Sequence, residues 1–211
     1  MQARIAVLDY GMGNLRSVEK ALERVGAVAT VTRDHGLIRD CDGVVLPGVG
    51  AFPKAMIAVR ELGFDVLMAD LLEVGTPSIG LCMGMQLLFD STTELGGGIG
   101  LGLLPGDVES LDSEGLKLPQ IGWNTVSWRR SSPLVQGLPD PCAFYHVHSF
   151  APVASETGDV LGTAVYGSEF VTAVERAPLF GVQFHPEKSG AHGLRLLENF
   201  AGICASVRAA A

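Results

Sequence analysis

One cysteine lies at the centre of a pattern typical of an enzymatic nucleophile. Cys82 has Gly80 two positions before it and Gly84 two positions after it, and an apolar run over residues 78–81 leads into it. This spacing is typical of a nucleophile elbow, a sharp turn from a strand into a helix where larger flanking side chains would collide. The start of a helix favours a thiolate at Cys82, and the N–H group of Met83 is then placed to bind a developing oxyanion.

A cysteine nucleophile needs a base close to it, and His185 is the best candidate among the five histidines. Pro186 follows and favours an extended backbone at His185. Residues two apart in an extended segment point to the same side, so Glu187 is expected beside the imidazole, where it fixes the tautomer. The sequence therefore predicts a triad of Cys82, His185 and Glu187.

A second oxyanion donor is expected in the segment LPGVGAF at residues 46–52. Gly48 and Gly50 flank Val49 and permit backbone torsions that direct an N–H group into a pocket. Either Val49 or Gly50 is then the donor that complements Met83 in an acyl-transfer site.

The first half of the chain contains the elements that must position these residues. Short apolar runs alternate there with helical patterns, and Asn14 is expected to cap the first helix. Strands are predicted over residues 4–9, 28–32, 43–46 (ending at Pro47) and 78–81, and helices over 15–25, 53–62, 65–74 and 83–89. Such alternation predicts a parallel sheet covered by helices on both faces.

The second half has a different pattern. Its short runs are typical of antiparallel or mixed strands, and Leu194, Leu197 and Phe200 share one face of a final helix. The runs lie at residues 124–128, 143–148, 160–166, 171–175 and 179–184. With no repeat and no linker, the chain is expected to form a single α/β domain over residues 1–211, with an antiparallel addition.

The composition argues against several classes of protein. Hydrophobic residues make up 47% and charged residues 18% of the 211 residues, so the chain is expected to fold around a sizeable core. The net charge is −8 without a long basic run, which argues against nucleic acid or an anionic membrane as a partner. Neither a signal pattern nor a bilayer-spanning stretch is found, so a cytoplasmic protein is expected.

Neither a metal nor a cofactor is predicted. The four cysteines form no CxxC pair and have no histidine at zinc-finger spacing. The segment at residues 9–17 begins like a dinucleotide-binding loop, but Arg16 stands where the third glycine belongs. This loop is instead interpreted as a candidate partner surface at the rim of the sheet.

Each motif by itself also has a plain structural interpretation. Cys82 alone fits an ordinary buried cysteine, the HPE triplet at residues 185–187 fits a turn after a strand, and the glycine pair at residues 46–52 fits a tight loop before a helix. The combination of the three motifs is what favours a catalytic site.

Taken together, the motifs resemble the class I (triad) glutamine amidotransferases, whose fold is flavodoxin-like. GLCMGMQ at residues 80–86 and QFHPEKS at 183–189 are similar to blocks shared across that family. Within it, the chain most resembles the glutaminase subunits of imidazole glycerol phosphate synthases. The blocks that carry this closer resemblance are DYGMGNLRS (9–17), LPGVGAF (46–52), LGLLPG (101–106), IGWN (121–124) and VHSF (147–150). Leu81, Met83 and Gln120 depart from the usual residues without changing the expectation.

The resemblance implies a class I amidotransferase fold, a mostly parallel sheet flanked by helices with a smaller antiparallel addition. It also implies that Cys82 attacks the side-chain amide of glutamine and that water then frees glutamate. Gln86 matches the position whose side chain contacts this substrate. The backbone around Gly50 and at His148, Ser149 and Phe150 would hold its α-amino and α-carboxylate groups.

The resemblance further implies a heterodimer in which a separate cyclase subunit forms a (β/α)8 barrel and uses the released ammonia. The complex would have lyase activity in histidine biosynthesis and would form imidazole glycerol phosphate and an aminoimidazole carboxamide ribotide. The expected contact residues are Asn14, Arg16, Trp123, Tyr145 and Lys188, each of which also fits ordinary surface packing. Movement of the loop at residues 47–50 would switch glutamine hydrolysis on only in the complex.

Three other functions remain open. A glutaminase subunit of another synthase, such as one in the vitamin B6 or anthranilate pathway, would share the triad but not the GWN and DYGMGN blocks. A cysteine peptidase of the same architecture would cleave peptides and not glutamine. A catalytically silent regulatory module would leave Cys82 unlabelled by a glutamine-mimicking diazo ketone.

Overall fold

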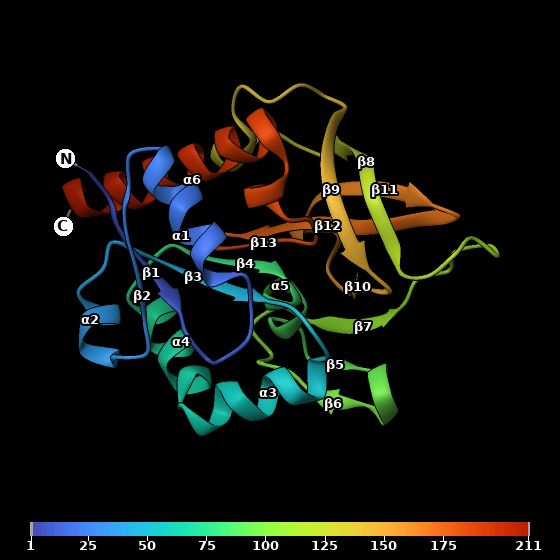
Figure 1. Cartoon of the computed structure of the whole chain (residues 1–211), viewed down its shortest axis with the longest axis horizontal. Helices are drawn as coiled ribbons and strands as arrows, with labels where there is room; N and C mark the ends of the chain where they lie inside the picture. Colours follow the sequence, from blue (N-terminus) through green and yellow to red (C-terminus); the bar gives the residue numbers. More distant parts are fainter. Residues whose placement is uncertain (1, 211) are drawn as a thin grey trace.

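The structure is a computed structural model that describes residues 2–210 of the chain (Figure 1). Within those residues the main feature is a sheet of nine strands, flanked by helices. In spatial order the strands are β2 (Val28–Thr32), β1 (Arg4–Leu8), β3 (Gly43–Gly48), β4 (Ser78–Cys82), β13 (Leu179–Val182), β12 (Ser168–Arg176), β11 (Val160–Tyr166), β8 (Gln120–Trp128) and β9 (Cys142–His148).

The large sheet has a parallel half and an antiparallel half. From β2 to β13 all neighbours pair in parallel, and from β13 to β9 all pair antiparallel. A smaller sheet lies beside the antiparallel half and consists of β10 (Phe150–Ala154), β7 (Gly106–Ser110), β5 (Ser91–Thr92) and β6 (Gly98–Ile99). The expected fold class, an α/β sheet flanked by helices with antiparallel additions, is confirmed.

Helices cover both faces of the parallel half (Figure 1). One face carries α1 (Leu15–Arg24) and α6 (Gly190–Ala210), and the other carries α2 (His35–Arg39), α3 (Phe52–Glu61) and α4 (Phe64–Glu73). A short helix, α5 (Met83–Leu87), follows β4 directly. Among the described residues, no helix combines the length and the hydrophobicity needed to cross a membrane.

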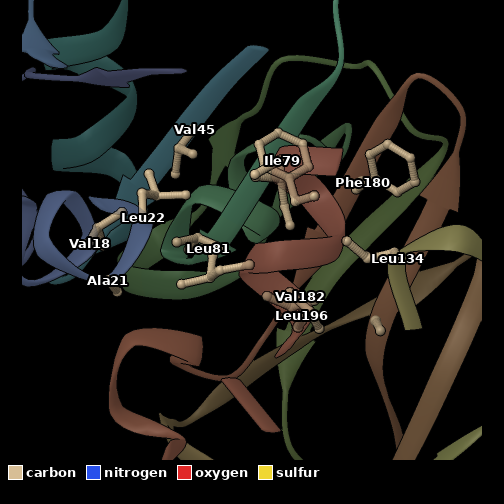
Figure 2. Close-up of a cluster of buried hydrophobic side chains, with 14 of the residues drawn as sticks. Val18, Ala21, Leu22, Val45, Ile79, Leu81, Leu134, Phe180, Val182 and Leu196 are labelled. Atoms are coloured by element: carbon tan, nitrogen blue, oxygen red, sulfur yellow. The ribbon is translucent and has the colours of Figure 1, made fainter. Parts of the chain in front are cut away.

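The core is divided by the sheet because side chains alternate along each strand. On β1, Ile5 and Val7 pack with α1 and α6, whereas Ala6 and Leu8 pack with α3 and α4. Figure 2 shows the first of these clusters, in which Val18 and Leu22 of α1 approach Val45, Ile79 and Leu81 of the strands. All of these side chains are almost completely excluded from solvent. Burial on both faces explains why these strands are continuous apolar runs.

Two local predictions in the first half of the chain were wrong. The third strand does not end at Pro47, because its parallel pairing with β4 continues until Gly48 lies opposite Cys82. Asn14 is the residue before α1, but its side chain makes no capping hydrogen bond. Instead, its backbone carbonyl accepts the N–H groups of Ser17 and Val18.

Candidate active site

The predicted site residues meet at one edge of the large sheet. β3 ends at Gly48, β4 ends at Cys82, and the chain reaches His185 three residues after β13. Because these strands are parallel neighbours, their carboxyl ends point the same way, and loops at such an edge form the usual ligand site of α/β sheets.

Cys82 occupies a strained elbow between β4 and α5. Its φ of 53° and ψ of −111° lie in a region that residues with a side chain rarely adopt. A Cβ atom on Gly80 would lie 2.6 Å from the backbone of Gly84, and a Cβ atom on Gly84 would lie 1.8 Å from the carbonyl oxygen of Leu46. The two glycines are therefore required by the close approach of α5 to β3 and β4, as predicted from their spacing. Met83 is the first residue of α5, where the N–H group has no acceptor within the helix.

His185 and Glu187 form a buried pair beside this elbow. The Nδ1 atom of His185 lies 3.0 Å from Oε1 of Glu187, and their side chains are 5% and 1% exposed. Since a carboxylate only accepts, Nδ1 donates, and the other ring nitrogen is free to hydrogen-bond Cys82. Burial lowers the pKa of His185, but hydrogen bonds and charge interactions with Cys82 and Glu187 outweigh it and raise the pKa to about 9. The imidazole is thus protonated at neutral pH and can donate a proton to a leaving group.

A cavity of about 310 Å³ opens at the sulfur side of the elbow. Cys82, Met83 and His185 line it together with the other predicted oxyanion and substrate residues, Val49, Gly50, Gln86, His148, Ser149 and Phe150. Glu94, Pro119, Val147 and Lys188 complete the lining. A larger cavity of about 600 Å³ lies elsewhere, against β7, β10 and β12, and none of the predicted site residues lines it. The structure therefore brings Cys82, His185, the end of the loop at residues 47–50 and the predicted glutamine contacts around one cavity. Glu187 is buried and reaches this site through its contact with His185.

The side-chain amide of Gln86 is fixed by two hydrogen bonds that its NH2 group donates. Nε2 donates to the carbonyl oxygen of Phe150 at 2.9 Å and to Oε1 of Gln183 at 3.0 Å. Its Oε1 atom is buried and has no partner among the described residues. This oxygen is available to accept a hydrogen bond from a bound molecule.

His148 is oriented in a similar way. Its Nδ1 atom lies 2.9 Å from the carbonyl oxygen of Phe150 and donates to it, so Nε2 carries a lone pair. Within residues 2–210 this buried Nε2 has no partner. Burial lowers the pKa of His148 to about 4, with a further contribution from the charge of His185. His148 is therefore a neutral acceptor beside the protonated His185.

His146 is a second buried neutral histidine on β9, and it predicts a loss of stability in acid. Burial, with smaller effects of His148 and His185, lowers its pKa to about 3. Because the folded-state pKa lies below the unfolded value of about 6.5, the full stability is present above pH 6.5 and is lost as the pH falls.

For His146 alone we expect a loss of roughly 3 kcal/mol in the free energy of unfolding by about pH 4.5. Urea denaturation between about pH 4.5 and 8 measures this loss. In His146→Phe, the slope of the free energy of unfolding against pH should fall on the acid side by the equivalent of about one proton. The contribution of His148 should remain. An unchanged acid limb in the variant would contradict the assignment.

The loop at residues 47–50 is held by a residue that was not predicted as part of the site. The hydroxyl group of Tyr10 donates to the carbonyl oxygen of Pro47 at 2.6 Å, and Tyr10 is 3% exposed. Burial and the charge of Cys82 raise the pKa of Tyr10, so the hydroxyl stays a donor. A Cβ atom on Gly48 would lie 2.5 Å from this hydroxyl and 2.8 Å from Cβ of Met83. Gly50, two residues further on, has a φ of +103°.

The predicted partner-contact residues gather around the same edge. Asn14 and Arg16 lie at the start of α1, which packs against η4 (Pro186–Lys188), the segment that contains Lys188. Trp123 and Tyr145 pair across β8 and β9, with their rings edge to face at 6.1 Å. Trp123 is 59% exposed, unusual for a side chain of this size, and Ile121 beside it is 62% exposed.

Sequence reasoning missed Glu94, Tyr10 and Gln183. Glu94, in η1 (Glu94–Gly96), lines the cavity, and its carboxylate accepts the N–H group of Phe52 at 2.8 Å. Gln183 is completely buried with its amide near the Cys82 sulfur. No spacing signal marked Glu94 or Tyr10, but Gln183 lies two residues before His185 and could have been found from the same alternation as Glu187.

An α/β sheet with a strained cysteine elbow and a buried His–Glu pair at its carboxyl edge is the arrangement of a triad amidotransferase. Residues 6–203 match the family model for glutamine amidotransferase class-I. The chain belongs to the class-I glutamine amidotransferase family.

Proteins similar in sequence indicate a particular group within this family. The chain is 48% identical to the imidazole glycerol phosphate synthase subunit HisH of Moorella thermoacetica, over 93% of both chains. It is 46% identical to HisH of Bacillus cereus over 94% of both chains. It is 47% identical to HisH of Pseudomonas syringae, over 93% of this chain and 96% of that one.

Solved structures show the same fold at low identity. A protein described as a putative GMP synthase subunit, from Thermoplasma acidophilum, superposes with a TM-score of 0.76 at 21% identity, over 100% of this chain and 98% of that one. The structure of PurLQS from Thermotoga maritima gives a TM-score of 0.76 at 22% identity, over 96% of this chain and 99% of that chain. These two likenesses bear on the fold alone.

Proposed function

We propose that this chain is the glutaminase subunit of an imidazole glycerol phosphate synthase of histidine biosynthesis. It hydrolyses glutamine and supplies ammonia to a cyclase subunit. The observation that carries the proposal is that Cys82 and His185 line one cavity while the buried Glu187 contacts His185. The near full-length likeness to HisH subunits supports the particular synthase.

The triad supports a two-step hydrolysis. The Cys82 sulfur attacks the carbonyl carbon of the glutamine side chain, and the N–H of Met83 and of Val49 or Gly50 stabilise the oxyanion, each contributing about 3 kcal/mol. His185 gives its proton to the leaving amine, so ammonia departs and a glutamyl thioester remains. His185 then takes a proton from water, the hydroxide attacks the thioester, and glutamate leaves as the sulfur regains its negative charge. Glu187 holds the imidazole in the required orientation.

The cavity lining accounts for recognition of a free amino acid. Glu94 places a carboxylate at the cavity, suited to the α-ammonium group of glutamine. Backbone groups at Gly50, Ser149 and Phe150 complete the binding of the α-amino and α-carboxylate groups. The unpartnered Oε1 of Gln86 would accept an N–H of the substrate. Peptides lack a free α-amino and α-carboxylate group at an internal residue, so this lining favours glutamine over a peptide.

The partner surface explains how ammonia reaches its acceptor. Free ammonia is mostly protonated at neutral pH and is then no nucleophile, so direct transfer into a partner preserves the reactive form. Lys188 lines the cavity, Trp123 and Tyr145 pair on the neighbouring strands β8 and β9, and Asn14 and Arg16 at the start of α1 extend the proposed surface. The exposed Trp123 ring is the expected anchor of this interface, since buried aromatic contacts contribute most to binding. The proposed location is the cytoplasm, where thiols such as the four free cysteines stay reduced.

Partner dependence is the test of this proposal. The free chain is expected to hydrolyse glutamine slowly, and a purified histidine-pathway cyclase with its nucleotide ligand should accelerate the reaction by at least about 100-fold, as binding completes the oxyanion hole. The measurement is glutamate release with and without the cyclase and its ligand. The anthranilate-pathway synthase partner is the control for a different synthase.

Trp123→Ala provides a matched variant for this assay. It should weaken cyclase binding roughly 30-fold or more, while a glutamine-mimicking diazo ketone still labels Cys82 in the free variant. Equal rates with and without the cyclase would refute partner activation. Peptide cleavage without glutamine hydrolysis would instead indicate a peptidase.

A further inference from the structure

A side-chain amide approaches the nucleophilic sulfur from the interior of the protein. The Nε2 atom of Gln183 lies 3.8 Å from Sγ of Cys82, on the side away from solvent, and Gln183 is completely buried. Its backbone N–H donates to the carbonyl oxygen of Thr172 at 2.8 Å, which anchors the segment that leads to His185. Gln183 and His185 are two residues apart in this extended segment and both reach Cys82.

The orientation of the Gln183 amide is determined by its neighbour. Gln86 donates from Nε2 to Oε1 of Gln183 at 3.0 Å, so that oxygen is the acceptor end of the amide. The same Nε2 donates to the carbonyl oxygen of Phe150. Turning the Gln183 amide over would bring two NH2 groups together and would direct an oxygen at the sulfur. The NH2 group of Gln183 therefore faces Cys82.

The polar groups around the Cys82 sulfur differ in whether they favour the neutral thiol or the thiolate. The carbonyl oxygen of Val147 lies 3.8 Å from Sγ and accepts the proton of the neutral thiol. The Gln183 amide and the His185 imidazolium are donors, and donors favour the negatively charged sulfur. At 3.8 Å the amide contact is long, so it contributes little to a neutral thiol and gains strength when the sulfur is charged.

We propose that Gln183 stabilises the thiolate of Cys82 and that Gln86 aims the Gln183 amide at it. The inference rests on the proposed role of Cys82 as nucleophile. The sulfur is negative before it attacks glutamine and again when water displaces it from the thioester. A fixed N–H donor at the sulfur thus assists both the formation of the nucleophile and its departure as leaving group.

Alkylation of Cys82 by iodoacetamide tests this role without glutamine. The thiolate forms a thioether with the acetamide group and releases iodide, and mass spectrometry of the Cys82 peptide gives the rate in the full free chain. Gln183→Met keeps the volume and removes the donor. We expect alkylation about tenfold slower at about pH 7, and a difference that shrinks towards unity at about pH 10, well above the reference pKa of a free cysteine.

Two further variants test whether the effect comes from the amide donor of Gln183. Gln183→Glu has the same shape but places a carboxylate at the sulfur, so its alkylation at about pH 7 should be slower still. Gln120→Met removes another buried amide, outside the cavity lining, and should react like the wild type. Thermal unfolding of each variant checks that it is folded.

The outcomes separate this inference from the proposed function. A folded Gln183→Met variant that reacts at the wild-type rate at about pH 7 overturns the inference and leaves the glutaminase proposal standing. A rate reduced equally at about pH 7 and pH 10 shows a packing role and also overturns it. A wild-type Cys82 that does not react at all overturns the role of Cys82 as nucleophile, and the inference with it.

Discussion

Cys82→Ala is expected to lower glutamine-dependent synthesis by the complex by about six orders of magnitude, the loss seen when a nucleophile that acts as part of a triad is removed. Synthesis from ammonium salts should remain within about twofold of the wild type, since the cyclase then receives ammonia without the glutaminase. The measurement is formation of imidazole glycerol phosphate with each nitrogen source. Alanine removes one sulfur atom from the cavity wall and leaves the elbow glycines unchanged, so the cyclase should still bind.

Cys142→Ala is the matched control for this result. Cys142 is a free, buried thiol on β9 that does not line the cavity, and burial raises its pKa to about 11. The control variant should keep glutamine-dependent synthesis. Glutamine turnover that persists in Cys82→Ala would exclude Cys82 as the nucleophile. Loss of ammonia-dependent synthesis would show damage to folding or docking.

Gly84→Ala is expected to destabilise the protein by about 3 kcal/mol or more and to reduce glutamine hydrolysis at least about 100-fold. The added Cβ would lie 1.8 Å from the carbonyl oxygen of Leu46, in a completely buried strand, so α5 and β3 must separate. This movement displaces Met83 and Cys82 relative to the loop at residues 47–50. Urea denaturation and glutamate release measure the two effects.

Gly202→Ala is the control for the general effect of replacing a glycine. Gly202 lies in α6, and a Cβ atom there would meet nothing within 4 Å. Alanine should stabilise that helix by about 0.5–1 kcal/mol and leave activity unchanged. A Gly84→Ala variant as stable as the wild type would show that α5 and β3 separate at little cost and that the elbow does not require a glycine.

The buried polar groups behind the cavity have a shared physical consequence. His146 and His148 are neutral, Gln86 and Gln183 are amides, and His185 carries the positive charge. Within this buried set, His185 is therefore the cationic partner of the Cys82 sulfur. Hydrogen bonds determine the orientation of each group, as the contacts of Gln86 to Phe150 and Gln183 illustrate.

Local patterns of apolar residues in the sequence predict much of the fold. Both faces of β1, β3 and β4 are buried, so these strands are continuous apolar runs. Such runs can be recognised in the sequence without the structure. The start of β8 at Gln120 was missed by four residues, because the usual burial pattern is inverted there: Gln120 is buried, whereas Ile121 and Trp123 are exposed. Pairing with His148 and its neighbours on β9 extends that strand.

The sequence by itself determined the elbow and the His185–Glu187 pair, because both depend on interactions between residues close in the chain. Gly80 and Gly84 are required by a local turn, and the proline after His185 sets a local backbone conformation. Only the tertiary structure decided which distant groups surround the sulfur. The Glu94 carboxylate and the Tyr10 hydroxyl reach the site through loop packing and through the arrangement of the strands. Such contacts arise from the order of strands in the sheet, which no spacing along the chain encodes.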